Sequence, residues 1–146
     1  MRLLRNDPRV RGITLVGGET ALTQELRAEL SGHVRDLIGR TSMADLPRLA
    51  AESAVIVCGN SAWLHIAEAV DRPAVVLEGP IVPGFGFNAR HPRSRRHEVT
   101  LPCRPCSKHG QGACDQTGDN YHACMTRINA AEVVHDVLAL VGQEAR

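Results

Sequence analysis

The sequence predicts an α/β fold in which helices cover a Rossmann-like parallel sheet. Short apolar, β-branched runs alternate with helical patterns along the chain. The connections between them are short and carry glycine or proline, as in sheets wound through right-handed crossovers. The length of 146 residues suits one domain. We therefore expect residues 1–146 to form a single Rossmann-like domain.

Composition excludes several classes of protein. The chain is 43% hydrophobic, but it has no apolar run of the roughly 20 residues that a membrane span needs, and its first residues lack a signal-peptide core. The net charge of +1 is too balanced for a general nucleic-acid surface, and the 3% aromatic content argues against stacking on single strands. These features predict a cytoplasmic protein with no transmembrane segment and no nucleic-acid partner.

Each element rests on its own pattern of residues. Strands are expected over Gly12–Val16, Val34–Ile38, Ala54–Cys58 and Ala74–Leu77, with a short edge strand over residues 98–101. Helices are expected over Glu19–Leu30, from Thr41 or Ser42 onward, and over Ala62–Val70 and Asn129–Gly142.

The ends of two helices carry capping signals. Thr41 or Ser42 is expected as an N-cap with Asp45 in the first turn, ahead of an apolar face formed by Met43, Leu46 and Leu49. Asn129 is expected to cap the last helix, with Glu132 reaching back to it.

Ligands of such sheets bind beyond the carboxyl ends of the strands, where Gly17–Thr20, Gly59–Ser61 and Glu78–Gly84 form loops. The middle loop opens a helix, whose free N–H groups attract phosphate. Asn60 and Ser61 can donate to phosphate or ribose, and His65 lies one turn further on. In the alternative interpretation, Asn60 or Ser61 merely caps the helix and His65 is an interior histidine.

The next strand ends in Glu78-Gly79-Pro80. Glu78 can accept hydrogen bonds from sugar hydroxyls, and Gly79 permits the close approach of a ligand. A plain structural turn is the alternative. Dinucleotide and P-loop glycine fingerprints are absent from the sequence.

Several motifs resemble family 9 glycosyltransferases, the ADP-heptose:lipopolysaccharide heptosyltransferases and their relatives. Residues 39–46 (GRTSMADL) resemble the family's G-x-T-S-hydrophobic-x-E-L element. The spacing to Gly59–His65 and Glu78-Gly79-Pro80 is similar to that of the family's N-D-S/T-G-x-x-H helix and F/Y-G-P turn. The cysteine segment, with Cys-x-Pro-Cys and a final "I-x-x-E-x-V", also recurs in many members. The resemblance extends over residues 12 to 141.

The resemblance implies the carboxyl-terminal, donor-binding half of a GT-B fold. A nucleotide-sugar donor, ADP-heptose-like, would lie between this half and an amino-terminal acceptor-binding domain or subunit that supplies the general base. It also implies that the chain is truncated at its first strand and is inactive alone.

The resemblance further implies a set of donor-binding residues and leaves the catalytic residues unknown. Thr41 and Ser42 would lie beside the nucleobase, while Asn60 and Ser61 would approach ribose or phosphate. His65 would support their loop, and Glu19 is a weaker candidate for the ribose hydroxyls. Two residues depart from the family pattern: Asn60 replaces an aspartate and Ala62 a glycine.

A cysteine-rich loop over residues 102–126 carries four of the five cysteines: Cys103, Cys106, Cys114 and Cys124. Four thiolates suit a structural tetrahedral Zn²⁺, with iron as the alternative, and His109 or His122 could replace a sulfur. Disulfides or free thiols are the other interpretations. The fifth cysteine, Cys58, ends a buried strand and is expected to be an inert core thiol.

The basic run over residues 90–97 is interpreted either as a solvated loop or as a surface that grips phosphate. Two functions remain open from the residues alone. One is the donor-binding domain of a glycosyltransferase that modifies a glycan or protein. The other is a non-catalytic α/β binding module with a structural zinc loop held by the four clustered cysteines.

Overall fold

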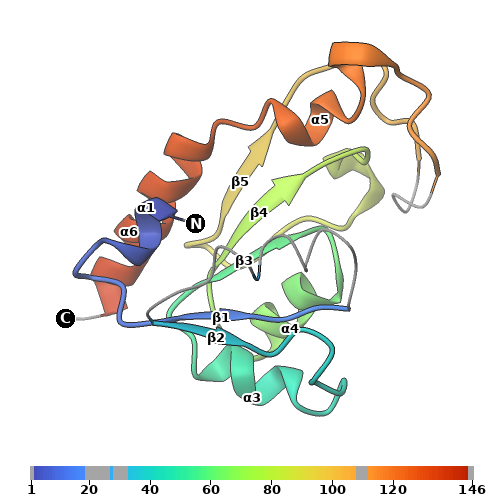
Figure 1. The fold of residues 1–146 in the computed structure, drawn as a ribbon. Helices are drawn as coiled ribbons and strands as arrows, with labels where there is room; N and C mark the ends of the chain where they lie inside the picture. Colours follow the sequence, from blue (N-terminus) through green and yellow to red (C-terminus); the bar gives the residue numbers. More distant parts are fainter. Residues whose placement is uncertain (1, 19–26, 28–32, 108–111, 145–146) are drawn as a thin grey trace.

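A computed structural model describes residues 2–18, 27, 33–107 and 112–144 (Figure 1). The helix expected over Glu19–Leu30 lies outside these residues except for Arg27, which is helical. No helix in the described part of the chain is both long and apolar enough to cross a membrane. The cytoplasmic location stays a prediction.

The described strands and helices alternate as expected. In chain order they are α1 (Arg2–Arg5), β1 (Ile13–Leu15), β2 (Val34–Asp36), α3 (Leu46–Ala51), β3 (Ile56–Gly59), α4 (Ala62–Ala69), β4 (Ala74–Glu78), the 3-10 turn η1 (Pro83–Phe85), β5 (Arg95–Glu98), the 3-10 turn η2 (Gly118–Asn120), α5 (Ala123–Thr126) and α6 (Ala130–Glu144).

The strands are parallel, which confirms the predicted sheet type, but their hydrogen bonding divides them into two groups. β4 lies between β3 and β5, and β1 pairs with β2. The expected single sheet is therefore interrupted among the described strands between β1 and β3. A cavity of about 310 Å³ lies there, lined by residues of both strands together with Leu49 and Trp63.

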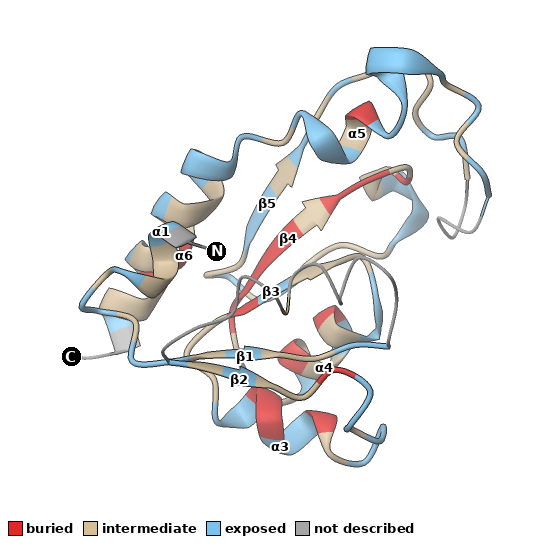
Figure 2. Cartoon of the chain, viewed as in Figure 1, coloured by how far each residue is buried: buried red, intermediate tan, exposed pale blue. Residues whose placement is uncertain are grey.

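The core lies on both faces of β4, because side chains alternate along a strand. Ala74 and Val76 pack with Leu64 of α4 in one cluster. Val75 packs with Val137 and Leu140 of α6 in another. Figure 2 shows this burial concentrated on β4 and on the helices beside it. The carboxyl end of β4 is thereby fixed between two layers.

The start of α3 corrects the sequence prediction. The helix begins at Leu46, with Asp45 rather than Thr41 or Ser42 in the N-cap position, and Met43 is 68% exposed instead of lying on the apolar face. Pro47 explains the shift, because a proline is tolerated in the first turn, where its missing N–H has no helical acceptor to lose.

Two later elements test the remaining expectations. The edge strand spans Arg95–Glu98 rather than residues 98–101, because its pairing with β4 outweighs its own polar composition. The basic run over residues 90–97 is therefore partly strand rather than wholly loop. The cap of α6 is confirmed: Asn129 Oδ1 accepts from the Ala131 amide at 3.0 Å, and Asn129 Nδ2 donates to Glu132 Oε1 at 2.9 Å.

Candidate functional site

Three polar side chains lie in a row across the carboxyl ends of β3, β4 and β5. Glu78 is opposite Glu98 in the register of β4 with β5. Gly59 is opposite Leu77 in the register of β3 with β4, so Asn60 follows one step later beside Glu78. Residues opposite each other in parallel strands point to the same face. The row brings together two residues, Asn60 and Glu78, that the sequence assigned to separate loops.

The loop after β3 presents the first turn of α4. Ser61 occupies the N-cap position in an extended conformation, but its side chain makes no capping hydrogen bond, and the residue is exposed. Gly59 and Ser61 line the 310 Å³ cavity, which is also lined by Thr14 of β1 and by Val16, just after that strand. The hydroxyl and the first N–H groups of α4 are therefore free to meet an anion.

His65 lies on α4 and is exposed, so the interior-histidine interpretation is wrong. Thr41 and Ser42 follow β2, where Ser42 is already engaged: its amide and hydroxyl donate to Asp45 Oδ2 at 2.8 and 2.7 Å. These two hydrogen bonds lower the pKa of Asp45. Thr41 and Ser42 do not line the cavity beside Ser61, and Glu19 lies outside the described residues.

Glu78 is a fully buried acid. Neither of its carboxylate oxygens makes a hydrogen bond in the described part of the chain, and the Asn60 Oδ1 atom is likewise buried without a hydrogen-bond partner there. Burial, as the largest cause, raises the pKa of Glu78, and Glu98 adds to the rise, while Arg96, Arg104 and the Asn60 side chain oppose it. The structure thus places an acid with a raised pKa at the strand end predicted to face a ligand.

Two arginines lie near this acid. The sequence placed Arg96 in the basic run over residues 90–97 without linking it to Glu78, and Arg104 was missed. Arg96 Nε is 3.8 Å from Glu78 Oε2, and its Nη2 is 2.9 Å from Glu98 Oε1. Arg104, with a side chain only 4% exposed, pairs with Glu98 at 3.2 Å and donates to the Ile81 carbonyl at 2.7 Å. Arg96 and Glu98 are two residues apart in the sequence, a spacing that places both side chains on one face of a strand. Nothing in the sequence marked Arg104 as buried.

All four clustered cysteines line a second cavity of about 270 Å³. They are free thiols. The pKa of the Cys124 thiol is raised, first by burial and then by its neighbours Cys106 and Cys114. However, the described residues contain no group of three or more histidine, cysteine, aspartate or glutamate side chains arranged to hold a metal ion. His122 contacts this cluster through its backbone amide, which donates a hydrogen bond to Cys114 Sγ at 3.4 Å. His109 lies outside the described residues.

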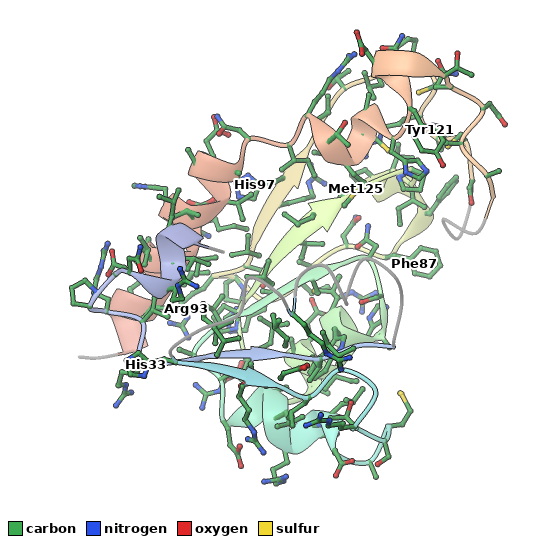
Figure 3. The ribbon with its side chains drawn as sticks, viewed as in Figure 1. His33, Phe87, Arg93, His97, Tyr121 and Met125 are labelled. Atoms are coloured by element: carbon green, nitrogen blue, oxygen red, sulfur yellow. The ribbon has the colours of Figure 1, made fainter. Side chains whose placement is uncertain are left out.

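The cysteine-rich segment packs against the turn that follows Glu78. The Cys106 amide donates to the Pro80 carbonyl at 3.3 Å. A Cβ atom added at Gly79 would lie 2.8 Å from Met125 Sδ, so Gly79 allows the close approach of α5. Figure 3 shows Met125 and Tyr121 on the side of the molecule where β4 ends. The turn and the cysteine segment therefore form one packed unit.

Comparisons with known proteins find one matching family and several similar sequences. A family model described as "Glycosyltransferase family 9 (heptosyltransferase)" matches residues 9–114. Lipopolysaccharide heptosyltransferase 2 of Salmonella typhimurium is 29% identical over 119 residues, which cover 82% of this chain and 32% of that protein. Lipooligosaccharide heptosyltransferase 2 of Haemophilus influenzae is 34% identical over 64 residues, covering 44% of this chain and 18% of that protein.

A solved structure, that of the E. coli ADP-heptose lps heptosyltransferase II, superposes with a TM-score of 0.67 and 26% identity. The match covers 92% of this chain and 38% of that one. The chain thus spans about a third of the length of the curated heptosyltransferase 2 relatives from Salmonella and E. coli.

Proposed function

This chain belongs to glycosyltransferase family 9, and we propose that it forms the nucleotide-sugar donor-binding domain of a glycosyltransferase. The donor is ADP-heptose-like, and the sugar is transferred to a glycan or protein acceptor. An amino-terminal acceptor-binding domain or subunit, as the partner, completes the cleft. The proposal places the protein in the cytoplasm, and the isolated chain is expected to be inactive.

The observation that carries the proposal is the cavity between β1 and β3, which extends to the carboxyl end of β3. Gly59 and Ser61 line it, and Ser61 leaves its hydroxyl unused at the start of α4. A helix N-terminus of this kind favours phosphate through its free N–H groups and its dipole. The structural match over 92% of the chain supports the same interpretation.

Each donor-binding residue has a proposed role. Asn60 and Ser61 approach the ribose or phosphate groups, and His65 supports their loop. Thr41 and Ser42 lie beside the nucleobase, and Glu19 meets the ribose hydroxyls. Glu78 acts at the same strand end, whereas Gly79 holds its turn against Met125 of α5 instead of giving a sugar close access to the backbone.

A thermal-shift panel of ADP-, UDP- and GDP-sugars on the full chain tests the proposal. One nucleotide series should raise the melting temperature, because a ligand that binds the folded state alone stabilises it. Ser61→Ala should reduce that rise, whereas the exposed control Arg48→Ala, far along α3 with a 64% exposed side chain, should leave it unchanged. No rise with any sugar nucleotide would contradict donor binding.

Asn60 separates two modes of binding. If it faces ribose hydroxyls, Asn60→Asp should keep or strengthen binding, because a carboxylate is the better acceptor. If it faces pyrophosphate, the same change should weaken binding, and more so at low salt, where repulsion is unscreened. We propose the ribose side. Calorimetry of both variants at two salt concentrations distinguishes the modes, and unchanged affinity in both would remove Asn60 from the site.

We also propose that the four cysteines of the 102–126 loop bind one structural metal ion, zinc or alternatively iron. The donor chemistry fits, since all four thiols border one cavity and thiolates favour these metals. The present spacing does not bring three of them within reach of one ion. Binding therefore requires the loop to contract and the thiols to lose their protons.

Elemental analysis of the full chain should give about one equivalent of zinc or iron. Cys106→Ser should release the metal and lower the melting temperature, whereas Cys58→Ser should retain it. Disulfide mapping that accounts for all four sulfurs, or four free thiols in metal-free protein, would contradict the proposal.

A further inference from the structure

The row of side chains at the carboxyl ends of β3, β4 and β5 contains buried polar atoms that lack partners among the residues that the structure describes. Three oxygen atoms lie buried there without a hydrogen-bond partner in the described residues: Asn60 Oδ1, Glu78 Oε1 and Glu78 Oε2. With Glu78 ionised, all three are acceptors. Buried acceptors without a donor are costly and rare, so these three oxygens require a hydrogen-bond donor.

The neighbouring cations do not supply it. Arg96 Nε, on β5, stays 3.8 Å from Glu78 Oε2, which is beyond hydrogen-bond distance. The Nη2 atoms of Arg96 and Arg104 are instead 2.9 and 3.2 Å from the two oxygens of Glu98. Arg104 is further held by the Ile81 and Val99 carbonyls. Neither guanidinium group therefore donates a hydrogen bond to Glu78. Arg96 is paired with Glu98, and Arg104 is held at its two Nη atoms while its Nε is buried without a hydrogen-bond partner in the described residues.

We infer that Glu78 holds a proton in the folded chain and exchanges two hydrogen bonds with the carboxamide of Asn60. The Glu78 O–H donates to Asn60 Oδ1, and Asn60 Nδ2 donates to the other Glu78 oxygen. The second N–H of Nδ2 is left for a ligand. Glu78 is thus a positioning residue, which acts on the donor through Asn60, and this part of the inference rests on the proposed function.

The surroundings of Glu78 agree with this arrangement. The carboxyl is fully buried, and burial is the main reason that its pKa is raised. The charged groups that face it are Arg96 and Glu98 from β5 and Arg104 from the segment after β5, while Asn60 from β3 is neutral. A neutral Glu78 avoids a buried negative charge beside the Glu98 carboxylate, which contacts both arginines.

The inference predicts a pH dependence with a definite sign. A raised carboxyl pKa means that the hydrogen-bonded pair is complete at low pH and is lost as the pH rises through that pKa. Above it, the carboxylate and Asn60 Oδ1 are two adjacent acceptors, and the carboxamide loses its fixed orientation. Affinity for a nucleotide should therefore fall as the pH rises.

Carbon-13 NMR of glutamate carboxyl groups in the full chain tests the proton directly. One carboxyl should titrate well above the ordinary glutamate range, should be absent in Glu78→Gln, and should move higher still in Asn60→Asp, where two acids share the proton. Glu52→Gln is the control, because it removes an exposed acid that pairs with Arg48 at the end of α3 and should leave the titrating signal in place. A Glu78 signal that titrates in or below the ordinary range would overturn the inference.

ADP affinity between pH 5.5 and 8.5 then tests the consequence for binding. The wild type should lose affinity several-fold across this range. Glu78→Gln, a neutral side chain with a permanent N–H, should lose this slope, and the exposed control Glu52→Gln should retain it. A wild-type slope in Glu78→Gln would overturn the positioning role. Absence of ADP binding in every variant would refute the proposed function instead, while the NMR titration still decides the inference about the proton.

Discussion

Arg104→Ala tests how the cysteine-rich segment is attached to the sheet. The guanidinium group of Arg104 is almost fully buried and contacts Glu98 and the carbonyls of Ile81 and Val99. Removing the guanidinium group leaves the Ile81 and Val99 carbonyls without this donor and leaves Glu98 with Arg96 alone. A buried polar group that loses its partner costs about 1–3 kcal/mol, so the total loss should be about 3–5 kcal/mol. We expect the free energy of unfolding to fall by about that amount. For a chain of this size the melting temperature should fall by roughly 6–20 °C.

Urea unfolding measures the loss, with Arg48→Ala as the control. Arg48 also pairs with an acid, Glu52 at 3.2 Å, but both side chains are more than half exposed. Such a pair contributes about 0.3–0.5 kcal/mol. Equal destabilisation by the two alanine variants would refute the assignment of Arg104 as a buried anchor.

Three further predictions follow from packing and burial. Leu64→Ala, at a fully buried position in α4, should lower the free energy of unfolding in urea by about 2–5 kcal/mol. Met43→Ala, at a 68% exposed position, should change it by less than about 0.5 kcal/mol. Similar losses in the two variants would contradict the assigned core. Gly79→Ala should lower the melting temperature, because its Cβ would lie 2.8 Å from Met125 Sδ, and adding Met125→Ala should recover part of the loss; no recovery would place the strain elsewhere. Burial raises the pKa of Cys58 to about 12, so its thiol stays protonated at pH 8. Mass spectrometry of chelator-treated protein should therefore find iodoacetamide on the exposed Cys106 well before it appears on Cys58. The reverse order would contradict the burial of Cys58.

Hydrophobic patterning predicted the elements that bury a continuous apolar run or one apolar helix face. β4 and α6 were found almost to their ends, because an unbroken apolar run and a repeating apolar face indicate burial directly. β5 was misplaced because its sequence, Arg-Arg-His-Glu, carries no strand pattern. It becomes a strand through its register with β4, and its charges are balanced by contacts with distant residues. The side chain of His97 on β5, for example, contacts α6, where its Nε2 atom is 3.0 Å from Asp136 Oδ2 (Figure 3).

The candidate site was predictable in part for the same reason. The rule that parallel strands end at one edge located Gly59–Ser61 and Glu78 without a structure. Sequence spacing did not reveal that Glu78 is fully buried or that Asn60 Oδ1 has no hydrogen-bond donor among the described residues. Both depend on the registers of β3 with β4 and of β4 with β5, which bring together segments that are separate in the sequence. Such contacts between distant segments are set by tertiary packing.

The most direct measurement of donor binding is the mapping of amide chemical shifts in the full chain on addition of ADP. The proposed function predicts changes centred on Gly59–Ser61 and extending to Thr41 and Glu78-Gly79, with weak affinity because the partner half of the cleft is absent. Changes confined to the basic run over residues 90–97 or to the cysteine-rich loop would contradict it, as would no change at millimolar ADP.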